Sequence, residues 1–200
     1  SDSAVPTSSR SRDRDTSGSG KLRNRGRRRV ERGVASAMLK NIPAAPDSMR
    51  PGATVLAWED GKTRVLRQGS NGLVCIADEP GNARFETACY HESLEPFMAR
   101  GRELKAQKKT RSEVDSIRLA DIKAKRYAFP STPVVLYNLA GPADSVDADG
   151  VPLKPMRWYV VYTPYATPKS TGLSLMPDGT GRPWLMYPGK PWAHIMITPK

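Results

Sequence analysis

Histidine is scarce in this chain, since only His91 and His194 occur among 200 residues. A histidine that acts as a general base needs a second side chain to orient its imidazole, and the sequence names no such partner. The chain also lacks the P-loop spacing of glycines and the Gly-x-Ser-x-Gly nucleophile elbow. A hydrolase-like enzyme that uses His194 or His91 is therefore the least favoured functional class. Catalysis by carboxylate or hydroxyl groups stays an alternative.

Cysteine is equally rare, and Cys75 and Cys89 are the two in the chain. Together with the two histidines they match no spacing that presents two metal ligands from one turn, so neither a metal nor another cofactor is expected. An even count allows a disulfide in an oxidising compartment and two thiols in the cytosol. A further alternative is a reactive Cys89 thiol, activated by His91 in the run ACYHE.

Long hydrophobic runs are absent from the sequence. The longest, such as Trp158–Tyr162, have the length of a strand and fall far short of the roughly 20 residues that span a bilayer. We therefore expect no transmembrane segment. The chain begins at Ser1 and not at methionine, which is expected both of a protein whose export signal has been removed and of a trimmed chain.

Basic residues are abundant: 32 Lys and Arg stand against 20 Asp and Glu, and the net charge is +12. Residues 1–26 are rich in Ser, Arg, Gly and Asp and have almost nothing to bury, so they are expected to form a disordered tail. Such a tail can contact a polyanion such as nucleic acid, and the residues that would do so are Arg23, Arg25, Arg27, Arg28 and Arg29. Residues 1–57 hold no aromatic side chain to stack on bases. Only weak polyanion contact is expected, and a solvated linker is the alternative.

The pattern changes from about Arg27, and one α+β domain is predicted over residues 27–200. An apolar stripe from Val30 to Met38 recurs at spacings of three and four residues, which indicates a helix that ends near Pro43.

Three β-rich runs follow, and the pairs Asp-Gly and Asn-Gly separate them. Such a pair between two β-rich runs is the strongest short hairpin signal, because both central residues of a type I′ turn need positive φ. The pattern therefore predicts a three-stranded antiparallel meander of Ala53–Trp58, Thr63–Arg67 and Leu73–Ala77, with turns at Asp60-Gly61 and Asn71-Gly72.

Helices are predicted in the middle of the chain. Apolar residues from Leu94 to Leu104 recur at helical spacing, and a second helix is predicted from Ser112, as its N-cap, through Ile122. Further strands are predicted in the runs PVVLYNL, RWYVVYT, WLMY and WAHIMI. Strands, then helices, then strands indicate an α+β fold in which an antiparallel sheet is combined with two or three helices.

Three short motifs carry a resemblance: the run VLRQGSNGLVCIADEPGN, the Cys89 that follows it, and the ending PWLMYPGKPWAHIMI. Together they resemble a family of bacterial proteins that are usually made with an export signal and have no known activity. The resemblance covers roughly residues 30–197, and the sequence departs from the family pattern at Leu73 and at His91. It implies a periplasmic or secreted protein. In that compartment a Cys75–Cys89 disulfide is favoured over reactive thiols.

Aromatic residues in the C-terminal strands provide the candidate binding surface: Trp158, Tyr162, Trp184, Tyr187 and His194. Alternation in a strand over Trp192–Ile197 places His194 on one face with Trp192 and Met196, where a hydrogen-bonded, structural histidine is expected. The alternative for the aromatic residues is that they are simply core. The favoured function is an exported, non-catalytic domain that binds a ligand or a surface.

Overall fold

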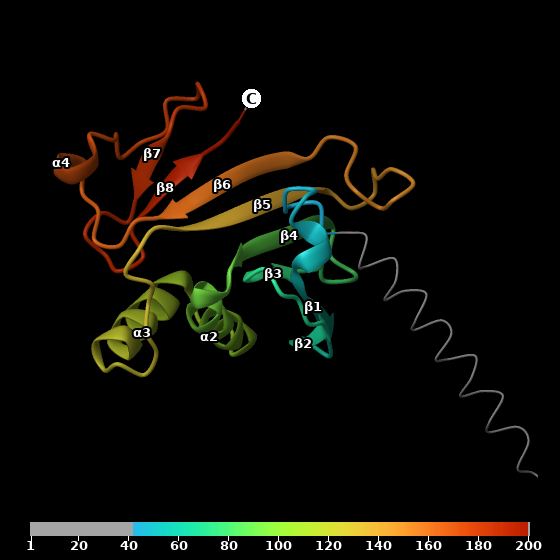
Figure 1. Cartoon of the computed structure of the whole chain (residues 1–200), viewed down its shortest axis with the longest axis horizontal. Helices are drawn as coiled ribbons and strands as arrows, with labels where there is room; N and C mark the ends of the chain where they lie inside the picture. The colour runs from blue at the N-terminus through green and yellow to red at the C-terminus, as the bar shows by residue number, and fades with distance from the viewer. Residues whose placement is uncertain (1–41, 200) are drawn as a thin grey trace, which may run out of the picture. The chain divides into compact units, whose positions relative to one another are not determined.

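An eight-stranded sheet forms the framework of residues 42–199, the part of the chain that the computed structural model describes (Figure 1). In chain order the strands are β1 (Thr54–Glu59), β2 (Lys62–Arg67), β3 (Leu73–Ile76), β4 (Arg84–His91), β5 (Val134–Pro142), β6 (Met156–Tyr162), β7 (Trp184–Met186) and β8 (His194–Ile197). Their order across the sheet is β2-β1-β3-β4-β5-β6-β8-β7. All neighbouring pairs are antiparallel except β1 and β3. The α+β class predicted from the sequence is confirmed.

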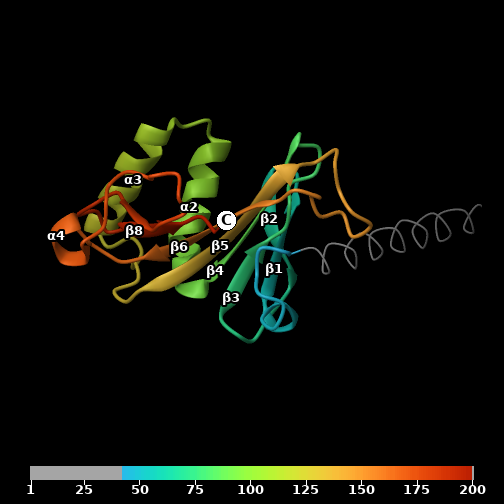
Figure 2. The same ribbon diagram turned by 90° about the horizontal axis from the view of Figure 1, so that it is seen from above.

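The helices of the described residues are α2 (Glu95–Ala106), α3 (Arg111–Lys123) and the short α4 (Pro168–Thr171), with 3-10 turns at Arg50–Gly52 and Glu92–Leu94. Figures 1 and 2 show α2 and α3 side by side, close to strands β4 to β6. The predicted boundary between the tail and the domain, at residue 26, lies outside the described residues. So does the predicted helix that ends near Pro43, except for Ile42 and Pro43 themselves. No helix within residues 42–199 is long and apolar enough to cross a membrane.

The face of the sheet toward α2 and α3 carries the larger core. Strand residues such as Tyr90, Val160 and Tyr162 pack there against Phe97 of α2, and Ile122 of α3 joins the same cluster. Alternation along each strand places these side chains on one face, and we call it the helix face. Apolar burial on this face therefore holds the two helices to the sheet.

The opposite face carries the two cysteines, and we call it the disulfide face. Cys75 on β3 is the direct cross-strand partner of Cys89 on β4, and the two form a disulfide with their Cα atoms 4.0 Å apart. Both are fully buried beside Val55 and Leu139, and Ile42 from the segment before β1 covers the same cluster. The predicted disulfide is thus confirmed, and a reactive Cys89 thiol is wrong because its sulfur is bonded.

Strand β3 pairs in parallel with β1 and not with β2, which corrects the predicted meander. The turn at Asp60-Gly61 forms as predicted, with φ of 51° and 74°. After β2, however, the chain crosses the start of β1, where the amides of Ser70 and Asn71 donate to the carbonyl of Gly52. A side chain at Gly69 would overlap the backbone of Ala53 and Thr54, so glycine makes this close crossing sterically feasible.

One strand and two element boundaries also differ from the prediction. Strand β4 was not predicted, although its inward residues Phe85, Thr87 and Cys89 alternate in the sequence. The N-cap of α3 is Thr110 and not Ser112, because Thr110 and Glu113 form a reciprocal capping box. Strand β8 begins at His194, two residues later than predicted, so Trp192 lies in the turn before it.

Gly101 and Arg118 join α2 to α3. The Arg118 guanidinium lies 3.8 Å from the centroid of the Phe97 ring and donates to the Phe97 carbonyl oxygen at 2.8 Å. A Cβ atom at Gly101 would overlap this guanidinium. Glycine in the middle of α2 therefore leaves the space that Arg118 occupies.

Gly101→Ala is expected to lower the free energy of unfolding by about 2 kcal/mol, although alanine normally stabilises a helix by about 1 kcal/mol relative to glycine. The loss arises because a displaced Arg118 gives up its cation–π contact and its hydrogen bond. Urea unfolding measures it. The same substitution in an Arg118→Met background is the control and should be neutral or stabilising. A destabilisation of equal size in both backgrounds would contradict the steric explanation.

Candidate binding cleft

A cleft of about 490 Å³ opens to solvent at the end of the helix face. One wall consists of Ile122 in α3 and of the segment that follows the helix, which contributes Tyr127 and Phe129. The other wall consists of Tyr165, after β6, and Pro191, before β8. Two loops and one helix end, far apart in the sequence, thus build one site at the C-terminal half of the sheet.

The inner wall of the cleft rests on a cluster of aromatic rings. Phe129 packs edge-on against Phe97, with ring centroids 5.0 Å apart, and against Tyr162 at 5.8 Å. Trp192, the neighbour of Pro191, packs on Phe97 at 5.7 Å. Aromatic packing of this kind adds to the stability that burial provides, so these rings support the inner wall.

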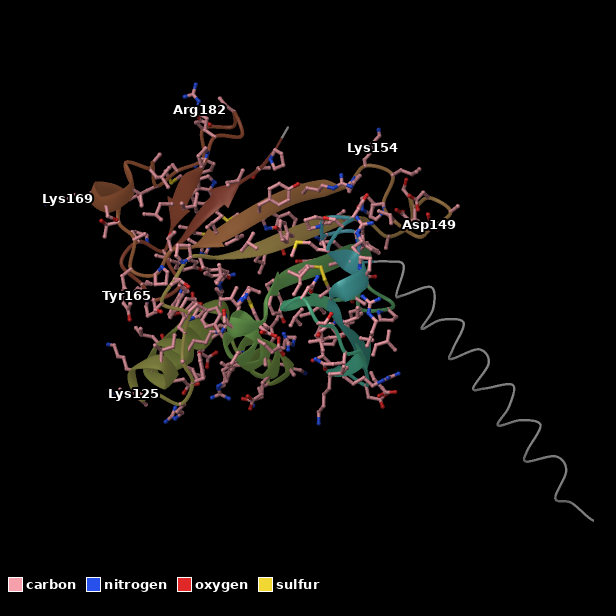
Figure 3. All side chains as sticks on the ribbon, viewed as in Figure 1. Lys125, Asp149, Lys154, Tyr165, Lys169 and Arg182 are labelled. Atoms are coloured by element: carbon pink, nitrogen blue, oxygen red, sulfur yellow. A yellow bond between two sulfur atoms is a disulfide. The ribbon has the colours of Figure 1, made fainter. Side chains whose placement is uncertain are left out.

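Tyr165 and Lys125 stand at the rim, and both have positive φ, at 61° and 54°. Lys125 follows the end of α3 in a Schellman motif, at the position where glycine is usual. Its backbone amide donates to the Ile122 carbonyl, and the amide of Arg126 donates to the Asp121 carbonyl. Positive φ costs a non-glycine residue about 1 kcal/mol or more. Residues held in this region cluster at ligand sites. Figure 3 labels both side chains, which come from separate segments.

The charge of the cleft is positive. Among the described residues, the lining of the cleft contains one charged side chain, Lys125, and no acidic one. Asp121, at the end of α3, is fully buried and paired with Arg100 at 2.8 Å and with Arg126. Its negative charge is therefore neutralised within the fold, and the cleft favours a neutral or anionic ligand.

Three residues of the predicted binding surface are brought together, behind the cleft and not in it. The His194 ring packs against Tyr162 at 5.1 Å and Tyr187 at 5.7 Å between centroids. Its Nδ1 lies 2.8 Å from the Trp192 carbonyl oxygen. Burial lowers the pKa of His194, so the ring is neutral, and Nδ1 donates to the carbonyl. Burial also raises the pKa of Tyr162 to about 12.

The two predicted tryptophans lie elsewhere. Trp158 is half-buried and packs against the core of the helix face. Trp184 lines a separate hollow of about 220 Å³ together with Pro177 and Arg182. The predicted polyanion residues of the tail, Arg23 to Arg29, lie outside the described residues, and their role stays a prediction.

Neither histidine has the surroundings of a catalytic base among the described residues. His194 hydrogen-bonds a backbone carbonyl, and the exposed His91 lies 2.8 Å from Ser93 Oγ and caps the turn after β4. No carboxylate of residues 42–199 hydrogen-bonds either ring. Within the same residues, no group of three or more His, Cys, Asp or Glu side chains is placed to hold a metal ion.

Sequence reasoning missed the residues that line the cleft. Tyr127, Phe129 and Tyr165 lie outside helices and strands, where hydrophobic periodicity carries no information. The available signal is the density of aromatic residues and proline in the runs RYAFP and TPYATP, both between regular elements. Apolar rings in loops need a reason to be there, because loops lie at the surface.

No family model, curated protein or solved structure matches this chain. The resemblance to exported bacterial proteins therefore rests on the short motifs alone and stays a prediction.

Proposed function

We propose that this domain is an exported, non-catalytic binding module that holds an apolar ligand, ring- or chain-shaped, in the cleft between Phe129 and Tyr165. One observation carries the proposal: an open, mostly apolar cavity of about 490 Å³ whose rim residues have unfavourable backbone conformations. Small-molecule sites typically measure about 300–1,000 Å³ and are lined by hydrophobic and aromatic side chains.

The lining decides what kind of ligand fits. Tyr127, Phe129 and Tyr165 offer ring faces and edges, and Pro130, Pro164 and Pro191 have no amide hydrogen to donate. Affinity would therefore come from apolar contact, with few hydrogen bonds to set orientation. The exposed ring of Tyr165, at 61% of its maximal accessible surface, would gain contact when a ligand enters.

Export is supported by the disulfide. Cys75 and Cys89 are bonded and fully buried, and disulfides persist in oxidising compartments such as the periplasm or the extracellular space. An extracytoplasmic location also agrees with a domain whose described helices include none that spans a membrane.

Titration with 4-phenylbutanol tests the proposal, because this neutral probe combines a ring with a short chain. Chemical-shift changes of backbone amides should concentrate at residues 122–131, 163–166 and 187–192. Changes spread over the whole domain, or confined to another face, would contradict the proposed site.

Tyr165→Gly is expected to weaken binding of 4-phenylbutanol about five- to tenfold, because an aromatic contact of about 1 kcal/mol is lost. Stability should stay the same or rise, since glycine adopts positive φ without strain and the lost ring is exposed. Lys108→Gly is the matched control: Lys108 also has positive φ, at 58°, but it ends α2 and does not line the cleft. It should leave affinity unchanged. Equal affinities of the Tyr165 variant and the parent would count against the cleft.

A further inference from the structure

The wall of the cleft that contains Tyr165 and Pro191 is held by one turn, residues 187–193. Pro191 belongs to this turn and lines the cleft. The amide of Tyr165 donates to the carbonyl of Lys190, whose side chain is exposed, at 2.9 Å. A change in the turn would therefore move both residues of this wall.

His194 holds the turn from the start of β8. Its Nδ1–H donates to the Trp192 carbonyl oxygen at 2.8 Å, near the end of the turn. Its ring also contacts Tyr187, the first residue of the turn, with centroids 5.7 Å apart. Tyr187 in turn packs edge-on against Trp192 at 6.2 Å between centroids. One imidazole thus links both ends of the turn that carries Pro191.

The surroundings of His194 suit a neutral ring. The residue is 7% exposed, and Tyr162 on β6 packs against it. Burial lowers the pKa of His194 and outweighs the hydrogen bond to the Trp192 carbonyl, which acts in the opposite direction. The phenols of Tyr162 and Tyr187 ordinarily titrate near pH 10, so neither supplies a negative charge to an imidazolium.

The charged groups near His194 come from α3, and two of the three are cations. Arg111 donates to the Tyr187 hydroxyl at 2.5 Å, and its positive charge further lowers the pKa of His194. Arg118 lies seven residues later on the same face of the helix. Asp115 pairs with Arg111 at 3.6 Å. Within the described part of the chain no carboxylate hydrogen-bonds the imidazole, so a proton on this ring would be poorly compensated.

We infer that the cleft releases its ligand in mild acid, because protonation of His194 opens the turn of residues 187–193. This inference rests on the proposed function, since the ligand is the one that the cleft holds. Opening lets water reach the imidazolium and withdraws Pro191 and Tyr165 from the ligand.

The direction of the effect follows from where the ring binds a proton more readily. In the open turn the pKa of His194 returns to about 6.5, above its value in the closed turn. The closed turn is therefore fully favoured above about pH 6.5 and is progressively lost as pH falls from there through the pKa of the closed form. A ligand that binds the closed turn alone loses affinity over this range, by up to about tenfold per pH unit.

The scarcity of histidine makes the effect easy to isolate. His194 and His91 are the two histidines of the sequence, and histidine is the side chain that ordinarily changes charge between about pH 5 and 8. His91 is exposed, caps the turn after β4 and does not line the cleft. His91→Gln is therefore the matched control for His194→Gln.

The test measures the affinity for 4-phenylbutanol, a probe without a group that titrates in this range, at pH 7.5 and at pH 5.5. Affinity should fall about threefold or more in the parent and in His91→Gln, and should stay constant in His194→Gln. If the probe does not bind at the cleft at pH 7.5, the proposed function fails, and the inference with it. If the parent binds equally well at both pH values, the proposed function stands and the inference is overturned.

Reciprocal linkage gives a second measurement that needs no variant of His194. If the ligand prefers the closed turn, saturation with 4-phenylbutanol must lower the pKa of His194, followed by NMR of its Cε1 proton, by about 0.5 or more. The pKa of His91, assigned with His91→Gln, should not change. A His194 pKa that is the same with and without the probe would overturn the inference, even if His194→Gln fails to fold.

Discussion

Replacing both cysteines, Cys75→Ala together with Cys89→Ala, is expected to lower the free energy of unfolding by about 3 kcal/mol. The bond closes a loop of 14 residues between β3 and β4, and a loop of that length restricts the unfolded chain by about this amount. Both residues are fully buried beside Val55 and Leu139, so the substitution also removes apolar contacts. Urea unfolding of the variant and of the oxidised parent gives the difference.

The parent protein unfolded in the presence of a reductant is the control for the crosslink. Its stability should fall toward that of the double variant, because neither chain then carries the bond. In the reduced parent, after the reductant has been removed, thiol labelling should appear only as the protein unfolds, since neither sulfur is accessible in the fold. A parent that keeps its full stability after complete reduction would show that the bond contributes nothing.

The position of the bond matters because β3 pairs in parallel with β1, while the other pairs among the described strands are antiparallel. Parallel pairing requires the chain to cross from β2 over the start of β1 before β3 can form. The disulfide ties β3 to β4, which continues antiparallel into β5. It therefore fixes a strand whose place depends on the crossing of the chain over β1.

The sequence predicted local conformation better than strand partners. Asp60-Gly61 and Asn71-Gly72 look alike, and Gly61 and Gly72 both adopt positive φ, at 74° and 71°. Only the first pair closes a hairpin. The Asn71 side chain instead donates to the Met49 carbonyl at 2.8 Å, and the Asn71 backbone amide donates to the Gly52 carbonyl. No local sequence pattern reveals these contacts. Gly72 adopts the predicted positive φ but Asn71 does not, so the dipeptide determined neither the full turn nor the strand that lies next to it.

The aromatic residues illustrate the same limit at the candidate site. Their concentration in the last strands pointed to the C-terminal half, and the His194 ring contacts both Tyr162 and Tyr187. Strand alternation could not show that α2 would cover them. Phe97 of α2 packs against Tyr162, with ring centroids 6.5 Å apart. The aromatic residues of the strands therefore lie beneath the helices, and residues of the loops line the cleft.

Within α3, the charged residues Asp121 and Arg118 lie one turn apart and have different surroundings. Asp121 is 1% exposed and accepts hydrogen bonds from Arg100 and from Arg126. Arg118 is half-buried and donates a hydrogen bond to the Phe97 carbonyl oxygen. A fully paired charge such as that of Asp121 serves the fold. Loss of the Asp121 carboxylate should therefore affect stability.

Asp121→Asn is expected to destabilise the domain by about 3 kcal/mol, the lower end of the range for a broken buried ion pair, because both arginines reach solvent. Burial alone would raise the pKa of Asp121, but the hydrogen bonds and charges of Arg100 and Arg126 outweigh burial and hold it below its usual value. The control is Glu103→Gln, which removes an exposed partner of Arg100 at 2.7 Å. That control should cost less than about 1 kcal/mol.

The difference between the parent and Asp121→Asn should depend on pH in one direction. Because the pKa of Asp121 is lower in the folded protein than in the unfolded chain, where it is about 3.9, the unfolded chain takes up the proton first as pH falls. The stabilisation by the carboxylate is fully present above about pH 5 and is lost as pH falls through the folded pKa. Urea unfolding at pH 7 and at pH 3 should therefore show the gap between the two proteins narrowing in acid. A gap that stays constant or widens would mean that Asp121 does not owe its effect to the ionised pair with Arg100 and Arg126.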